Sequence, residues 1–157
     1  MNPVRSVELV KVTFTKLVEK RVTTWTAVRN KRTVVPGSTM ALGRGGMPHD
    51  LEQLIVEAVV GLEHGFWGSI AEGATFRSIG RKRTKPGREV VRRNRVDIEL
   101  SEHIAHYHLD RWRAGKSTPC AEALSEFEAR WRDLGDSESF TLVWPTLEVL
   151  DSESTAA

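Results

Sequence analysis

The sequence contains a single cysteine, Cys120, and no long apolar run. One cysteine excludes an intramolecular disulfide, so covalent cross-links do not contribute to the fold. The N-terminus lacks the apolar region of a secretory signal. The most apolar stretch, residues 54–62, includes Glu57 and is too short to span a bilayer. These features predict a cytoplasmic protein with no membrane partner.

Motifs specific enough to define a reaction are also missing. The chain has no Gly-Lys-Ser/Thr of a P-loop, no GxGxxG and none of the HExxH or CxxC metal signatures. The glycine-rich residues 43–46 are therefore interpreted as a flexible connector. The absence of motifs that define a reaction favours a non-enzymatic protein, and no cofactor is expected.

The length and composition are those of one globular domain. The chain has 157 residues, of which 39% are hydrophobic and 28% charged, enough to bury a core. We expect a single domain over residues 1–145. Residues 146–157 are acidic and rich in Ser, Thr and Ala, which predicts a disordered tail.

Alternating apolar residues predict strands at both ends of the chain. Val10, Val12 and Phe14 alternate with polar residues, as in a half-buried strand. Residues 21–30 are rich in β-branched residues, which suit a pleated sheet, and a third strand is expected over 32–35, stopped by a Pro-Gly pair. Near the C-terminus, residues 139–145 repeat the alternation and predict a last strand that pairs with the N-terminal sheet.

Helical periodicity fills the region between these strands. We expect a helix from Pro48, a second over 66–74, a long third over 89–114, and a fourth with Pro119 in its first position and an end at Gly135. One face of the long helix is lined by Val96, Leu100, Ile104 and Tyr107, and this apolar stripe is widened by Ile98, Ala105, Leu109 and Trp112. The predicted fold class is α+β, with a small antiparallel sheet (N-terminal hairpin plus C-terminal strand) packed against about four helices.

One block carries a resemblance. The string PHDL, then VE, then GL-x-x-GFWG, over residues 48–68, resembles an uncharacterised family of small bacterial proteins. That family also has strands first and a late strand ending in Trp-Pro, as at Trp144-Pro145. The resemblance implies no activity.

The strongest functional signal is a basic segment at residues 77–95. It contains nine basic residues and one acid, a net charge of +8, while the other 138 residues sum to −6. Such a block can neutralise phosphates and bind nucleic acid or an acidic protein partner in a salt-sensitive manner. No aromatic residue lies within it, which argues against a base-stacking platform. The residues expected to bind are Arg81, Lys82, Arg83, Lys85, Arg88, Arg92, Arg93 and Arg95.

A second hypothesis is a small metal-dependent enzyme. His103 and His106 are three positions apart on the long helix and could share one ion with Glu57, His49 or His64 from the first helix region. The simpler interpretation of these histidines is ion pairing with Glu99 and Asp110 along a solvated helix face.

A third candidate is a polar site at the first helix. His49 and Asp50 lie at its start, and Glu57 interrupts its apolar run. A buried carboxylate needs a partner or a shifted pKa, and we expect a histidine or arginine to be that partner. The last alternative is a protein–protein adaptor with exposed Trp25 or Trp112 at its interface. The sequence does not define an oligomeric state.

Overall fold

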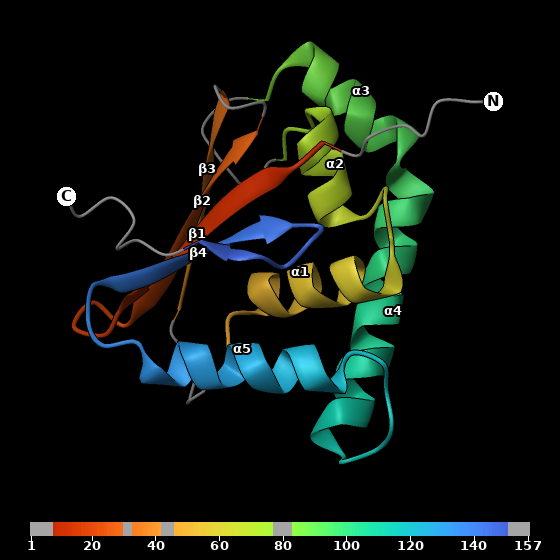
Figure 1. Cartoon of the computed structure of the whole chain (residues 1–157). Helices are drawn as coiled ribbons and strands as arrows, with labels where there is room; N and C mark the ends of the chain where they lie inside the picture. The colour runs from red at the N-terminus through yellow and green to blue at the C-terminus, as the bar shows by residue number, and fades with distance from the viewer. Residues whose placement is uncertain (1–7, 30–32, 42–45, 77–82, 151–157) are drawn as a thin grey trace.

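A five-stranded antiparallel sheet forms one side of the molecule in the computed structural model, which describes residues 8–29, 33–41, 46–76 and 83–150 (Figure 1). Its strands are β1 (Val10–Leu17), β2 (Val22–Arg29), β3 (Thr33–Ala41), β4 (Glu138–Trp144) and β5 (Val149–Leu150). The order is β3-β2-β1-β4-β5, with β4 antiparallel to β1. The predicted pairing of the C-terminal strand with the N-terminal hairpin is therefore confirmed.

The third strand is longer than expected. The prediction ended it at Pro36-Gly37, but β3 continues to Ala41 and pairs with β2 over its whole length, with an irregularity opposite Thr24 to Thr26. Proline is tolerated because β3 is an edge strand. Gly37 lies so close to Trp25 that a Cβ atom would be 1.7 Å from the Trp25 carbonyl oxygen. The glycine therefore permits the strand to continue where sequence rules predicted a stop.

The helices lie together on one face of the sheet (Figure 1). They are α1 (His49–Val60), α2 (Phe66–Glu72), α3 (Lys85–Arg93), α4 (Arg95–Arg113) and α5 (Ala121–Asp133). This arrangement confirms the α+β class and a single domain. The last helix begins two residues after Pro119 and ends before Gly135, so both of its predicted limits were slightly too wide.

The predicted long helix is divided at Asn94. This residue is buried, and its side-chain amide donates to Ser69 Oγ at 3.1 Å and to Glu72 Oε1 at 3.3 Å. Both acceptors belong to α2. The tertiary hydrogen bonds hold Asn94 at φ −97° and ψ 8°, which ends α3 and begins α4. The chain therefore has five helices in its described part instead of about four.

α1 is the most enclosed helix. Its seven consecutive residues from Leu51 to Glu57 are all buried, including the polar Glu52, Gln53 and Glu57. The helix contacts α2, α4 and α5 and shares the hydrophobic core with β1, β2 and β4. A helix surrounded in this way must bury its polar positions, so each needs a hydrogen-bond partner.

Only part of the predicted apolar stripe of α4 faces the core. Ala105 and Leu109 are buried, together with Ser101. In contrast, Val96, Leu100 and Tyr107 are exposed. The predicted wide apolar stripe is therefore only partly buried.

The predicted tail is partly ordered. Val149 and Leu150 pair with Leu142 and Thr141, so the sheet extends into residues 146–150, which the prediction had placed in a disordered tail. Residues 151–157 lie outside the described part of the chain. Across the described ranges, none of the helices has the length and apolar character needed to cross a membrane.

Candidate functional site

The described part of the basic segment, residues 83–95, contributes to the lining of a surface hollow of about 420 Å³, here called the arginine hollow. Arg88 and Arg92 come from α3, Arg95 from the first residue of α4, and Arg83 from the residues before α3. Arg88 and Arg92 are four positions apart on α3 and therefore lie on one face of that helix, and Arg95 follows them directly after the break at Asn94. The lining residues are Thr75, Phe76, Arg83, Arg88, Val91, Arg92 and Arg95.

The start of α3 is fixed against the chain that precedes the basic segment. Thr84 caps the helix, and its Oγ1 accepts a hydrogen bond from the Gly87 nitrogen at 3.0 Å. Thr75 donates its own backbone N–H to the Gly87 carbonyl at 3.3 Å. Gly87 is buried so closely that a Cβ atom there would lie 2.3 Å from Thr75 Oγ1. Glycine at this position thus lets the helix dock and holds the arginines around the hollow.

The positive charge of the hollow is only weakly compensated. Arg92 lies 3.7 Å from Glu89, and Arg95 lies 3.6 Å from Glu99, both as exposed pairs along the helix. Exposed ion pairs of this kind are weak and contribute only about 0.3–0.5 kcal/mol each to the free energy of unfolding. Within the described residues, Arg83 and Arg88 form no ion pair. The hollow therefore presents several cations to solvent.

Not all the predicted basic residues belong to this hollow. Arg93 points to α2 and pairs with Glu72 at 2.7 Å, so its role is structural. Lys85 is exposed at the first turn of α3 and does not line the hollow. Arg81 and Lys82 lie outside the described residues. The structure thus brings together Arg83, Arg88, Arg92 and Arg95 out of the predicted set.

Phe76 is a member of the site that the sequence did not indicate. Its ring lies on the wall of the arginine hollow, half-buried, and packs against Phe66 with ring centroids 5.0 Å apart. The sequence argument considered only aromatics inside residues 77–95, and Phe76 lies one position before them. A basic surface with an adjacent aromatic ring is the arrangement used to hold single-stranded nucleic acid.

Glu57 is fully buried, but its partners are not the predicted histidine or arginine. Its carboxylate accepts hydrogen bonds from the backbone N–H groups of Phe66 at 2.8 Å and Trp67 at 3.0 Å, and from Gln53 Nε2 at 3.1 Å. Glu57 thus caps the first turn of α2. Burial raises the pKa of Glu57 to about 7, although the hydrogen bonds from Gln53 and the backbone act to lower it.

His49 and Asp50 have separate contacts. Asp50 Oδ2 accepts from Trp25 Nε1 at 2.8 Å, and the Asp50 carbonyl accepts from Trp67 Nε1 at 3.1 Å. His49 is exposed, 3.9 Å from Glu52, and its ring centroid lies 5.9 Å from that of His106. Asp50 and Glu57 therefore position the core tryptophans and α2, a structural task.

The histidines do not assemble a metal site. His103 and His106 are exposed on α4, while His64 pairs with Glu72 at 2.5 Å beside α2. Partial burial acts to raise the pKa of Glu72, but hydrogen bonds from His64 and Arg93 leave that pKa below its ordinary value. In residues 8–29, 33–41, 46–76 and 83–150, no three or more His, Cys, Asp or Glu side chains are grouped so as to hold an ion.

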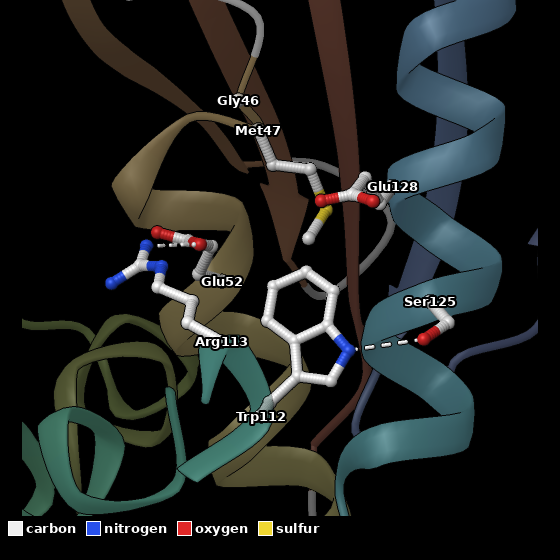
Figure 2. Close-up of a pocket in the computed structure, with 7 residues that line it drawn as sticks. All are labelled: Gly46, Met47, Glu52, Trp112, Arg113, Ser125 and Glu128. Atoms are coloured by element: carbon white, nitrogen blue, oxygen red, sulfur yellow. Dashed lines mark hydrogen bonds and ion pairs between the residues drawn. The ribbon is translucent and has the colours of Figure 1, made fainter. Parts of the chain in front are cut away.

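A second hollow of about 430 Å³ lies between the start of α1, the end of α4 and α5, and Figure 2 shows its lining. Glu52 is buried in it and pairs with Arg113 at 2.7 Å. Burial raises the pKa of Glu52, against the opposing effect of Arg113. The indole N–H of Trp112 donates to Ser125 Oγ at 3.0 Å. The second carboxylate in the lining of this hollow, that of Glu128, pairs at 2.9 Å with Arg132, which lies outside the hollow.

The polar groups of this second hollow are thus satisfied within the chain, and a ligand is not needed to complete them. The ion pair of Glu52 and Arg113 joins residues 61 positions apart, so no local sequence pattern could have indicated it. The tryptophans proposed for an adaptor surface also have internal roles. Trp25 is buried in the core, and Trp112 is half-buried in this hollow.

Comparison with known proteins adds no further information. No family model, curated protein or solved structure matches the chain. The resemblance of residues 48–68 to a bacterial family therefore stays a prediction, and the functional argument depends on the geometry of the arginine hollow.

Proposed function

We propose that the protein is a non-enzymatic module that binds single-stranded nucleic acid at the arginine hollow. The observation that carries the proposal is the gathering of Arg83, Arg88 and Arg92, with Arg95, around one depression that has Phe76 on its wall. Guanidinium groups bind phosphate oxygens in bidentate fashion. An aromatic ring offers a base a stacking surface that every base can use.

The charge distribution supports the same function. The basic segment has a net charge of +8 on a chain whose remaining residues are net acidic. Charge concentrated in one place attracts a polyanion and orients it before contact. Since the contacts are to phosphates and to a ring face, binding should tolerate many sequences and weaken strongly as salt increases.

A titration with a fluorescently labelled 12-nucleotide single strand of mixed sequence, followed by anisotropy at low salt, tests the proposal. Arg88→Gln with Arg92→Gln should reduce affinity by at least about tenfold, because each lost phosphate contact removes a charge-assisted hydrogen bond of about 1 kcal/mol or more.

The matched control is Arg130→Gln with Arg132→Gln, which removes two exposed arginines from α5. This variant should bind like the wild type. Equal losses in both double variants would mean that only net charge matters and would contradict a site at the hollow. An acidic peptide that competes fully with the oligonucleotide, and binds more tightly, would replace nucleic acid by an acidic protein as the partner.

A further inference from the structure

The outer side of α4 exposes an apolar face. The exposed fractions are 76% for Val96, 51% for Leu100 and 58% for Tyr107. The buried residues of the helix, among them Ala105 and Leu109, lie on its opposite side. In Figure 1, α4 forms the edge of the molecule farthest from the sheet. Large apolar side chains grouped in this way on a surface usually mark an interface.

The spacing of this face is that of a coiled coil. Positions 96, 100, 103, 107 and 110 follow one another at intervals of four and three residues, the heptad pattern of a helix that packs on a second helix. Val96, Leu100 and Tyr107 supply the apolar contacts, and His103 and Asp110 occupy the remaining positions. These residues define the α4 face.

We propose that the α4 face binds the α4 face of a second copy of the chain, with the two helices antiparallel. In this register Val96 lies opposite Tyr107 of the second copy, and Leu100 opposite His103 of the second copy. Glu99 and His106 both flank the same side of the α4 face, seven residues apart. Antiparallel pairing therefore sets each Glu99 beside the other copy's His106, whereas parallel pairing would bring together opposite flanks of the face and set Glu99 beside the apolar Ile104 of the other copy.

A hollow beside the α4 face gives this arrangement room. It has a volume of about 260 Å³ and lies between Asp97 and Leu100 on α4 and the turn at residues 61–65. In the antiparallel register the ring of the second copy's Tyr107 reaches Val96 and this hollow, and its hydroxyl can donate to the Asp97 carboxylate. The contact is self-complementary, as a twofold dimer requires.

The first test is the oligomeric state of the full chain, measured by sedimentation over about 1 µM to 1 mM, a range that covers weak dimers with small interfaces. We expect the wild type to double its mass as concentration rises, and Leu100→Glu to stay monomeric. Val34→Glu, which changes an equally exposed apolar residue on β3, should dimerise like the wild type. A wild type that stays monomeric up to 1 mM, or a Leu100→Glu variant that still dimerises, would overturn the proposal.

The register is tested by disulfide trapping in a Cys120→Ala background. Residues 96 and 107 are eleven positions apart on one helix, about 16 Å along its axis, so Val96→Cys with Tyr107→Cys cannot close a disulfide within one chain. The double variant should give a covalent dimer upon oxidation, and each single variant should not. Efficient cross-linking of a single variant would contradict the antiparallel register.

A charge exchange gives a third readout. Glu99→Lys should weaken the dimer because it removes the carboxylate that accepts a hydrogen bond from His106 of the second copy, and adding His106→Glu should restore the dimer because it again sets opposite charges side by side. Failure of the second change to restore dimerisation would overturn the pairing of these two residues. The dimer and the arginine hollow are independent, since the Leu100→Glu monomer keeps Arg88 and Arg92 and should bind the labelled single strand at its hollow.

Discussion

The carboxylate of Glu57 lies 2.8 Å from the backbone nitrogen of Phe66, the first residue of α2. An acidic side chain in the last turn of the buried helix α1 thus holds the start of the next helix. The first N–H groups of a helix have no partner within it, so an acceptor supplied by another helix satisfies them. This contact requires a glycine at position 65, because a Cβ atom on Gly65 would lie 2.7 Å from the Glu57 carboxyl carbon.

The first prediction concerns the pH dependence of stability. Because burial raises the pKa of Glu57 from 4.5 to about 7, the folded chain holds more protons at this position than the unfolded chain between these two pH values. The free energy of unfolding should therefore fall as pH rises from about 4.5 to 7, by about 3 kcal/mol from this group, and level off above pH 7.

Glu57→Gln removes this titration. Urea unfolding at several pH values should show a smaller decrease between pH 4.5 and 7 for the variant than for the wild type. Glu122→Gln, at an exposed position of α5, is the control and should leave the wild-type slope unchanged. Parallel curves for the wild type and Glu57→Gln would show that Glu57 has an ordinary pKa.

The second prediction concerns the pair of Glu52 and Arg113. Arg113→Ala leaves the buried Glu52 carboxylate without the guanidinium 2.7 Å away. Because Arg113 is half-exposed and water can partly replace it, we expect a loss of about 1–2 kcal/mol in the free energy of unfolding. Arg130→Ala, at an exposed position, should change stability by less than about 0.5 kcal/mol. If Arg113→Ala and Arg130→Ala lowered the free energy of unfolding equally, the pair of Glu52 and Arg113 would not stabilise the fold.

The third prediction links the packing of α3 to binding. Gly87→Ala places a methyl group against Thr75 and forces the start of α3 away from it. The variant should unfold at a lower denaturant concentration, with a loss of about 1–3 kcal/mol, and should bind the labelled single strand more weakly because the arginines move apart. Gly46→Ala has open space around it and should be neutral in both measurements. Normal binding by a destabilised Gly87→Ala variant would contradict this link.

The fourth prediction concerns Phe76. Phe76→Leu keeps an apolar group against Phe66 but removes the flat ring from the arginine hollow. Affinity for the single strand should fall by about five- to 100-fold, the range for the loss of one stacked base. Affinity for duplex of the same length should change little, since its bases are already stacked. Equal losses for both substrates would show that Phe76 acts only through packing.

Local patterns sufficed for much of the fold. The alternation of Val10, Val12 and Phe14 predicted a strand whose apolar side is buried, and the periodicity after Pro48 predicted α1 almost to its ends. In contrast, the division of α3 from α4 depends on hydrogen bonds from Asn94 to α2, which no local rule contains. Which part of the apolar stripe of α4 is buried also depends on the neighbours of the helix, so periodicity alone could not show it.

The candidate site could be predicted only in part, because some of its contacts also depend on residues distant in the sequence. Clustering in sequence identified Arg88, Arg92 and Arg95, because one helix turn brings such positions to one side. It could not show that Arg93 turns away to Glu72, or that Phe76 joins the hollow. For Glu57, the sequence indicated a buried carboxylate but suggested the wrong partners, since backbone N–H groups carry no sequence signal.

The salt dependence of single-strand binding tests the central proposal most directly. Each phosphate contact contributes about 0.7 to the slope of log K against log salt concentration. If Arg88 and Arg92 each contact a phosphate, Arg88→Ala with Arg92→Ala should reduce the magnitude of that slope by about 1.4, while Arg130→Ala with Arg132→Ala leaves it unchanged. An identical slope for the wild type and the hollow variant would show that the arginine hollow is not where the nucleic acid binds.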